Sequence, residues 1–418
     1  MKPRLILMFL LCSMSWLAAA DWPQWLGPSR DSISKETGLL EQWPSEGPKL
    51  LWQVDGLGDG YGAPAVVGGR LYLVSNQGLE DETLRAMSVE DGKTIWTLRM
   101  GKVGNPDQAP AYPAARSTPT VDGALVYAFS SDGDLVCAEA ATGKVKWKKS
   151  ARQEFGGEPG KWAYSESPLL DGDTVVVTPG GSQATLLALS KKTGKLIWKS
   201  AIPGGESAGY SSAIIVNGGG RKQYVQFLSK GVVGVDAKTG AMLWRYDQTS
   251  KGPANIPTPV GGDGYVYSTA RSMTAGGLVK LSAKPDGGVT AEQVYFERGL
   301  PSAIGGSVRV GEYLYGTTGE GLVAAEFLTG KIRWTNASVG AGAVLFAQGH
   351  LYVYGEDGPA ALVEATPEAY REKGRFTPPG KPAHPRGARE KSWAYPVLAN
   401  GRLYLRDLGK LWCYDVRK

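Results

Sequence analysis

Cysteine is scarce in this chain of 418 residues, which contains only three. Cys12 lies in an apolar N-terminal stretch, while Cys137 and Cys413 lie in apolar runs of separate repeats. We predict that Cys137 and Cys413 are buried free thiols, and a disulfide between them in an oxidising compartment is the alternative.

Histidine is scarcer still, with only His350 and His384. One segment, Gly205-Glu-Ser207-Ala-Gly209, fits the Gly-x-Ser-x-Gly pattern. A nucleophile elbow requires a strand before it, a helix after it, and a histidine and an acid nearby. Here the motif leads into another predicted strand, and the two histidines lie in a hairpin turn and a proline-rich loop. We therefore do not expect a hydrolase.

Long apolar runs are absent after residue 20, so we expect no transmembrane segment. Residues 1–20 have the features of a secretory signal: Lys2 and Arg4, an apolar run over 5–11, and a small-residue site at 18–20. We expect cleavage after Ala20 and a periplasmic or secreted mature protein. The net charge of +6 is small for this length and does not indicate a nucleic-acid partner.

Glycine is abundant, with 58 residues, and many glycines belong to one recurring phrase. The phrase reads Ala-Ala-Thr-Gly-Lys-Val-Lys-Trp at 140–147, and full or partial copies end at Trp52, Trp96, Trp147, Trp198, Trp244 and Trp334. Neighbouring copies are about 44 to 51 residues apart, and one interval is about twice as long. Such a period indicates a repeat architecture in which each unit holds about four short strands joined by glycine turns.

These repeats predict an all-β, eight-bladed propeller of four-stranded antiparallel blades over residues 48–418. Inner strands are expected to start near Ala63, Ser117, Ser167, Ser212, Thr258, Ser307, Ala343 and Tyr395. Residues 49–54 should pair with 411–415, so that an N-terminal strand closes the last blade and removes an open edge. Residues 21–47 show no period, and we expect a strap on the outside of the ring. Seven blades plus a strap is the alternative.

The Thr-Gly-Lys-x-x-Trp phrases resemble the tryptophan docking motif of the PQQ-like β-propeller repeat proteins. The mature chain is similar to BamB-type outer-membrane assembly factors, and the opening Asp21-Trp-Pro-Gln-Trp25 resembles a secreted branch of that superfamily. Quinoprotein alcohol dehydrogenases share the fold. The resemblance of this chain to these enzymes implies that PQQ binds over the channel, beside a vicinal cysteine pair and a calcium ion held by Glu, Asn and Asp. No two cysteines are adjacent here, and the chain is much shorter than those enzymes.

Side chains just before the inner strands are the candidate binding residues, because the repeat places them around one mouth of the ring. They are Tyr61, Arg116, Tyr164, Glu166, Tyr210, Ser211, Asn255 and Trp393. Aromatic, charged and amide groups in such a ring favour a polar ligand. The alternative is that Arg116 and Glu166, about one blade apart, pair only to fix adjacent blades. The six phrase-ending tryptophans are expected to pack between blades and not to form a ligand cage.

The pattern leaves three functional hypotheses. The first is a monomeric, non-enzymatic scaffold that binds an envelope protein or a small polar ligand on one face, with no cofactor and no catalytic or metal site. The resemblance extends this to outer-membrane protein biogenesis. The second is a PQQ-dependent dehydrogenase that requires PQQ and calcium. The third is a carbohydrate-binding or carbohydrate-active propeller that uses carboxylates such as Glu166.

Overall fold

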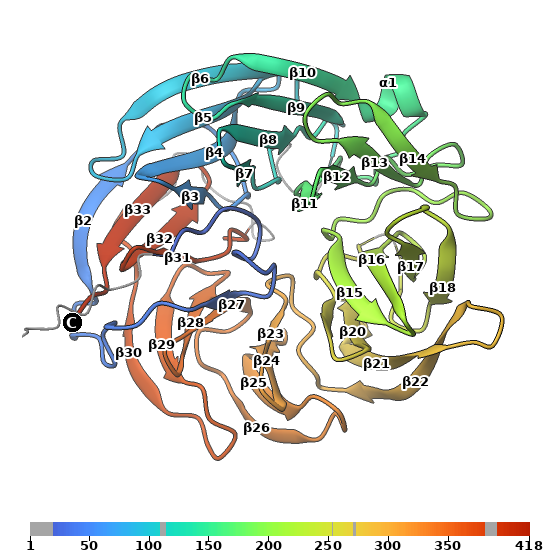
Figure 1. The fold of residues 1–418 in the computed structure, drawn as a ribbon. Helices are drawn as coiled ribbons and strands as arrows, with labels where there is room; N and C mark the ends of the chain where they lie inside the picture. The colour runs from blue at the N-terminus through green and yellow to red at the C-terminus, as the bar shows by residue number, and fades with distance from the viewer. Residues whose placement is uncertain (1–19, 109–113, 253, 271–272, 381–390) are drawn as a thin grey trace, which may run out of the picture.

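The computed structural model describes residues 20–108, 114–252, 254–270, 273–380 and 391–418. These residues form eight antiparallel sheets arranged as a ring of blades (Figure 1). The predicted all-β, eight-bladed propeller of four-stranded blades is confirmed, and the seven-bladed alternative is wrong. The predicted signal peptide lies outside the described residues. No helix in the described residues is long and apolar enough to cross a bilayer.

The first four blades follow one another along the chain, and each runs from its inner to its outer strand. Blade 1 contains β3 (Ala65–Val67), β4 (Arg70–Gln77), β5 (Asp81–Ser88) and β6 (Thr94–Gly101), and blade 2 contains β7 (Thr120–Asp122), β8 (Leu125–Phe129), β9 (Asp134–Glu139) and β10 (Val145–Ser150). The helix α1 (Ala151–Phe155) follows β10. Blade 3 contains β11 (Leu169–Asp171), β12 (Thr174–Val177), β13 (Leu186–Ser190) and β14 (Leu196–Ser200), and blade 4 contains β15 (Ile214–Gly218), β16 (Arg221–Phe227), β17 (Val232–Asp236) and β18 (Met242–Tyr246).

The other four blades complete the ring. Blade 5 contains β19 (Val260–Gly262), β20 (Tyr265–Ala270), β21 (Ala275–Ala283) and β22 (Val289–Arg298), and blade 6 contains β23 (Ser307–Val310), β24 (Tyr313–Thr317), β25 (Leu322–Glu326) and β26 (Ile332–Asn336). Blade 7 contains β27 (Gly342–Ala347), β28 (His350–Gly355), β29 (Ala360–Glu364) and β30 (Glu372–Phe376), with β1 (Ile33–Ser34) added in parallel beside β27. Blade 8 contains β31 (Val397–Ala399), β32 (Arg402–Asp407), β33 (Lys410–Asp415) and β2 (Lys49–Val54).

The two ends of the chain close the ring, as the sequence predicts. Strand β2 pairs antiparallel with β33, with Lys49 opposite Asp415 and Val54 opposite Leu411. The last blade thereby gains its outer strand from the start of the chain, and β33 does not remain an open edge.

Most phrase-ending tryptophans join one blade to the next. The indole Nε1 of Trp96 donates to the carbonyl of Ala140 at 3.1 Å, and that of Trp147 donates to Lys191 at 3.0 Å. Trp52, Trp198 and Trp334 make equivalent bonds to Val89, Ala237 and Thr366. Trp244 differs, because its Nε1 donates to Gln223 within the same blade. The indole N–H of each of the other phrase-ending tryptophans thus bonds across a blade boundary, and only the bond of Trp244 stays within its own blade.

Two blades lack a tryptophan in the docking position and fill it differently. In blade 5, Tyr295 occupies the position, and its hydroxyl donates to the carbonyl of Phe327 at 2.9 Å. In blade 7 the position is Gly374, opposite Leu362. A Cβ on Gly374 would lie 2.6 Å from the Cβ of Trp43, whose ring packs 5.8 Å from that of Tyr352. Trp43, from before the repeats, therefore supplies the aromatic ring that blade 7 lacks.

The N-terminal segment, residues 22–34, lies at the centre of the ring, where it is drawn in blue in Figure 1. Trp22 pairs with Val66 of β3, and Phe346 of β27 donates its backbone N–H to Ser32. The side chain of Trp25 donates to Thr258 at 3.1 Å and packs 4.4 Å from the ring of Tyr395. These partners belong to inner strands or their starts in four separate blades. Residues 22–34 therefore lie inside the ring, whereas the sequence predicts a strap outside it.

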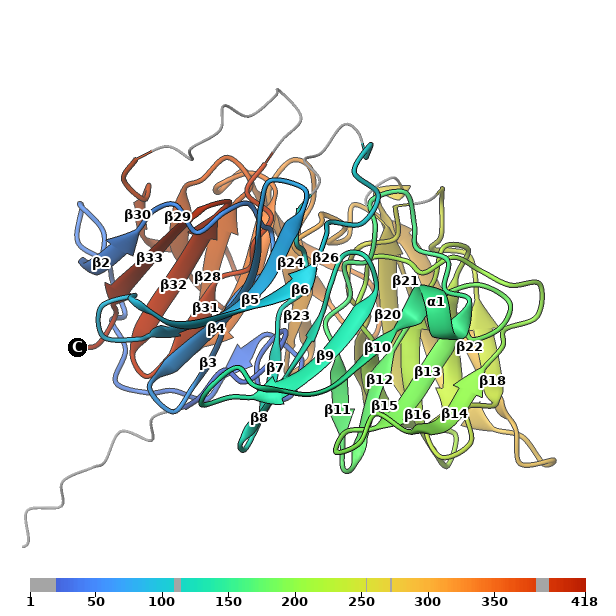
Figure 2. The ribbon, with the colours of Figure 1, turned by 90° about the horizontal axis from the view of Figure 1, so that it is seen from above.

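The two faces of the ring differ in their connections (Figure 2). One face, called here the hairpin face, carries the turns from each inner strand to its neighbour and the Thr-Gly turns. The backbone of the N-terminal segment runs beside these turns, since Asp21 accepts a bond from Gly68 and Glu36 accepts bonds from Asn400 and Gly401. The opposite face, called here the loop face, carries the links from each outer strand to the next blade. Cys137 and Cys413 are buried and free, as predicted.

Candidate functional site

Three of the predicted site residues come together on the loop face, from the links that precede blades 1, 2 and 8. The rings of Tyr61 and Trp393 lie 5.1 Å apart, and the guanidinium carbon of Arg116 lies 5.1 Å from the centre of the Tyr61 ring. The backbone N–H of Tyr61 donates to Ala115 at 2.8 Å. A Cβ on Gly62 would lie 2.2 Å from the carbonyl oxygen of Ser117, so glycine allows these two links to lie side by side.

The charge of Arg116 is held in a largely desolvated environment. Its Nη1 donates to the carbonyl of Ala114 at 2.9 Å. Burial lowers the pKa of Arg116, while Tyr61, Tyr210 and the carboxylate of Glu82 act in the opposite direction. A cation over an aromatic ring can bind an anionic group and pack against an apolar one, which are the two properties of a polar-ligand or peptide site.

Glu82 is a buried acid whose charge acts on Arg116, and no sequence pattern identifies it. Its carboxylate accepts hydrogen bonds from the backbone N–H of Ser131, at 3.0 Å, and from the Ser131 hydroxyl. Burial is the largest cause that raises the pKa of Glu82 to about 7, against the hydrogen bonds from Ser131 and the charge of Arg116. Because Glu82 lies on β5 and Ser131 on the next blade, this contact also joins blades 1 and 2.

Glu166 and Ser211 belong to a second network, in blades 3 and 4. Glu166 accepts from the backbone N–H of Thr178 at 2.6 Å and from the side-chain amide of Gln226 at 3.1 Å. The hydroxyl of Ser211 donates to the other side-chain atom of Gln226, Oε1, at 2.8 Å. Burial raises the pKa of Glu166 to about 7, and the cation that opposes this is Arg30. An Arg116–Glu166 pair is therefore not supported, because each group has a different charged neighbour.

The other three predicted residues hold the loops in place. The ring of Tyr164 packs 5.0 Å from that of Phe129, and its hydroxyl donates to Pro179 at 2.7 Å. The hydroxyl of Tyr210 accepts from the backbone N–H of Trp162 at 3.2 Å. Asn255 is 0% exposed and donates to the carbonyls of Leu228 and Ser229 and to the Ser250 hydroxyl. These three residues thus make hydrogen bonds within the protein, and Tyr210 also lies close enough to Arg116 to oppose the lowering of its pKa.

Arg30 is the central residue that sequence reasoning missed. Its guanidinium donates to the carbonyl of Pro168 at 3.0 Å and to that of Ser167 at 3.1 Å. Burial lowers the pKa of Arg30 to about 10, although the charge of Glu166 acts the other way. Arg30 lies in a segment without periodicity, so no repeat position identifies it as a residue at the axis. Its contacts fix the N-terminal segment to blade 3.

The sequence matches a known family model over residues 33–111 and 107–308, and the family is described as outer membrane protein assembly factor BamB. The chain belongs to this family. It is also similar to the quinoprotein alcohol dehydrogenase PedH of Pseudomonas putida, with 25% identity over 205 residues. That match covers 47% of this chain and 30% of the relative, so the chain matches under a third of the enzyme's length.

Solved structures share the fold at low sequence identity. BamB from Moraxella catarrhalis superposes with a TM-score of 0.61 and 16% identity, covering 88% of this chain and 99% of that one. A europium-containing methanol dehydrogenase superposes with a TM-score of 0.53 and 12% identity, covering 92% of this chain and 89% of that one. At this identity both comparisons establish the propeller fold and no activity.

Two features implied by the resemblance to the dehydrogenases, a vicinal cysteine pair and a metal-binding group, can be compared with the described residues. Cys137 and Cys413 are buried in blades 2 and 8, so they cannot form a vicinal pair. Within the described ranges, no group of three or more His, Cys, Asp or Glu side chains is placed to hold a metal ion. The buried acids Glu82 and Glu166 are already bonded to Ser131 and Thr178.

Proposed function

We propose that this protein is an exported, non-enzymatic scaffold that binds an envelope protein through its loop face and takes part in outer-membrane protein assembly. The observation that carries the proposal is the cluster of Tyr61, Arg116 and Trp393, which three consecutive blades bring together on that face. Family membership supports the assembly role, because the family is described as an outer-membrane assembly factor. A small polar ligand at the same cluster is the alternative occupant.

The arrangement of the two faces supports the choice of the loop face. The N-terminal segment covers the centre of the hairpin face and is fixed there by main-chain pairing with β3 and β27. A partner that approaches the axis from that side would have to displace it. On the loop face, an arginine beside aromatic rings has the composition typical of binding hot spots.

Affinity purification after cross-linking in intact cells tests the proposal. The wild-type protein should recover an outer-membrane protein or its assembly machinery, and Arg116→Ala should reduce that recovery by about tenfold, as expected for a hot-spot side chain. Thermal unfolding of the purified variant shows whether the fold is intact. If Arg116→Ala lowers only the melting temperature and recovers the partner at the wild-type level, the binding role of the cluster is wrong.

The second candidate, a PQQ-dependent dehydrogenase, is favoured by the sequence similarity to PedH. A dehydrogenase should reduce a dye with an alcohol or a sugar once PQQ and calcium are added, whereas a scaffold should not. We favour the scaffold because no two cysteines are adjacent in the sequence and because the match to PedH covers under a third of that enzyme. For the carbohydrate hypothesis, Glu166 is 2% exposed and bonded to Thr178 and Gln226, so it is not available to a sugar.

A further inference from the structure

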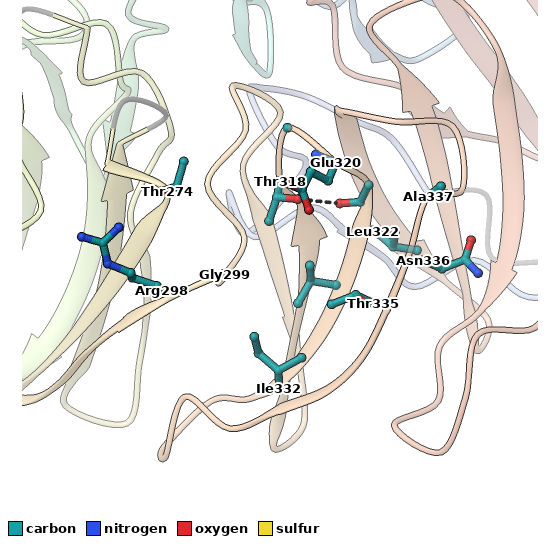
Figure 3. Close-up of a pocket in the computed structure, with 13 residues that line it drawn as sticks. Thr274, Arg298, Gly299, Thr318, Glu320, Leu322, Ile332, Thr335, Asn336 and Ala337 are labelled. Atoms are coloured by element: carbon teal, nitrogen blue, oxygen red, sulfur yellow. Dashed lines mark hydrogen bonds between the residues drawn. The ribbon is translucent and has the colours of Figure 1, made fainter.

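A groove with a volume of about 700 Å³ lies between blades 5 and 6, on the outer part of the ring (Figure 3). One wall comes from the end of β22 and includes Arg298 and Gly299, and the other comes from β26 and the turn that precedes β25. The volume is within the range of ligand sites in proteins. The groove is separate from the cluster of Tyr61, Arg116 and Trp393.

The link between the two blades is short. It spans only residues 299–306, whereas the link between blades 2 and 3 is longer and carries α1 against β10. A Cβ on Gly299 would lie 3.1 Å from the Cδ1 of Ile332. Glycine at position 299 thus keeps the short link from filling the groove beside Ile332.

The groove combines an apolar floor with one charge on each wall. Leu322 and Val323 are buried beneath it, and Ile332 is 38% exposed. Arg298 lies on the blade 5 wall, with its guanidinium directed away from Ile332 in Figure 3, and Glu320 lies on the blade 6 wall. In the part of the chain that the structure describes, no ion pair engages either side chain. Such a surface is complementary to an apolar group flanked by one negative and one positive charge.

The shape of the wall favours an extended chain as the occupant. Strand β26 is the last strand of its sheet, so one edge of its backbone has no neighbouring strand in the described residues. Thr335 and Asn336 of this strand line the groove. An extended peptide can bond to such an edge while alternate side chains enter the groove. None of the described lining residues is aromatic, which leaves no ring on which a sugar or a base could stack.

We propose that the groove between blades 5 and 6 binds an extended peptide segment of a partner protein. The segment carries an apolar residue that contacts Ile332, with an acidic residue facing Arg298 and a basic residue facing Glu320. This inference rests on the proposed scaffold role and adds a second, sequence-selective contact to it. Such a contact uses different residues from the loop-face cluster.

Fluorescence anisotropy with short synthetic peptides tests the inference. The peptides share a Gly-Ser background around Asp-Ser-Leu-Ser-Lys, Asp-Ser-Leu-Ser-Asp or Lys-Ser-Leu-Ser-Lys, because alternate residues of an extended chain share one face. The wild-type protein should bind the mixed-charge peptide most tightly. Arg298→Glu should shift the preference to the lysine peptide and Glu320→Lys to the aspartate peptide, each by about fivefold or more. Ile332→Asp should weaken all three.

Matched controls separate the groove from general charge effects. Lys280→Glu reverses an exposed charge on β21 outside the groove, and Ile95→Asp changes an apolar residue that is 47% exposed on β6. Both should keep the wild-type preference. The inference is wrong if no peptide binds at about 1 mM protein, or if the charge reversals leave the ranking unchanged. It is also wrong if sedimentation shows a dimer that Ile332→Asp dissociates, because the groove then binds a second copy of this chain.

Failure of the peptide test does not decide the loop-face proposal. Arg298, Glu320 and Ile332 lie outside the cluster of Tyr61, Arg116 and Trp393, so the groove variants should still recover the envelope partner through Arg116. Loss of partner recovery in Arg116→Ala with peptide binding retained would in turn show that the two surfaces act independently.

Discussion

The glycine of the recurring phrase has two physical roles at the residue scale. Gly143 has a φ of +74°, which only glycine adopts without strain in a tight turn. A Cβ at this position would also lie 2.7 Å from the ring of Trp96 in the preceding blade. Gly194 has the same relation to Trp147, at 2.9 Å. The glycine turn of each of these two phrases therefore packs against the docking tryptophan of the preceding phrase.

A pair of substitutions in blade 2 separates these roles. Gly123→Ala places a methyl group at a φ of +55° with no atom within 4 Å, so it should cost about 1 kcal/mol of unfolding free energy. Gly143→Ala should cost a further 1 to 3 kcal/mol, roughly, because the methyl group overlaps the Trp96 ring. Urea unfolding of both variants measures the difference. Equal losses would show that the ring contact contributes nothing.

A buried acid gives the fold a pH dependence at the same scale. Burial raises the pKa of Glu166 from 4.5 to about 7, so between these values the folded protein keeps a proton that the unfolded chain has released. Wild-type stability should therefore fall as the pH rises through this range. The unfolding free energy of Glu166→Gln minus that of wild type should therefore rise by about 2 to 3 kcal/mol between pH 5 and pH 8.

Urea unfolding at both pH values tests the Glu166 prediction. Glu320→Gln, which removes an exposed carboxylate, is the matched control. A difference between Glu166→Gln and wild type that stays constant with pH would show that Glu166 is ionised in the folded protein throughout the range. Its role in the network with Thr178 and Gln226 would then need a different account.

At the scale of elements, two blades depend on segments from outside the repeats. Blade 8 takes its outer strand, β2, from the start of the chain, and blade 7 takes an aromatic ring from Trp43. Trp43 is 4% exposed and packs against Tyr352 and Phe376. The segment that leads to β2 therefore joins blades 7 and 8 as well as entering the ring.

Removing the Trp43 ring should destabilise the protein as much as removing a docking tryptophan of the repeats. Trp43→Ala and Trp198→Ala should each cost about 3 to 5 kcal/mol, as truncations of buried aromatic side chains. Ile95→Ala, at an exposed position, should stay within about 0.5 kcal/mol of wild type. Thermal or urea unfolding compares the three. A Trp43→Ala variant as stable as Ile95→Ala would refute its docking role.

Repeated features could be predicted from the sequence, and isolated ones could not. Each phrase that ends at Trp96, Trp147 or Trp198 predicts a turn, the strand that follows it and the end of a blade. The number of blades and the pairing of β2 with β33 therefore follow from counting the phrases. Trp43 and Arg30 lie in a segment without a period, and their partners are more than a hundred residues away. The position of a residue within its repeat also predicts that it lies near the axis, but it does not predict which side chains it contacts. Tyr61 and Arg116 therefore come together, whereas Tyr164 and Asn255 pack into loops.

At the scale of the whole molecule, the two faces of the ring are not equivalent. The N-terminal segment contacts inner strands or their starts in blades 1, 3, 5, 7 and 8 and covers the centre of the hairpin face. The loop face carries the cluster of Tyr61, Arg116 and Trp393, and the groove lined by Arg298 and Glu320 lies towards the same side. We therefore propose that partners bind at the loop face.

Site-specific photo-cross-linking in intact cells tests this assignment most directly. Exposed positions Leu79 and Lys161 report on the loop face, and Ala124 and Lys192 report on turns of the hairpin face. A photoreactive amino acid at Leu79 or Lys161 should capture an envelope protein, while one at Ala124 or Lys192 should not. Capture from the hairpin turns alone, or equally from both faces, would contradict the account.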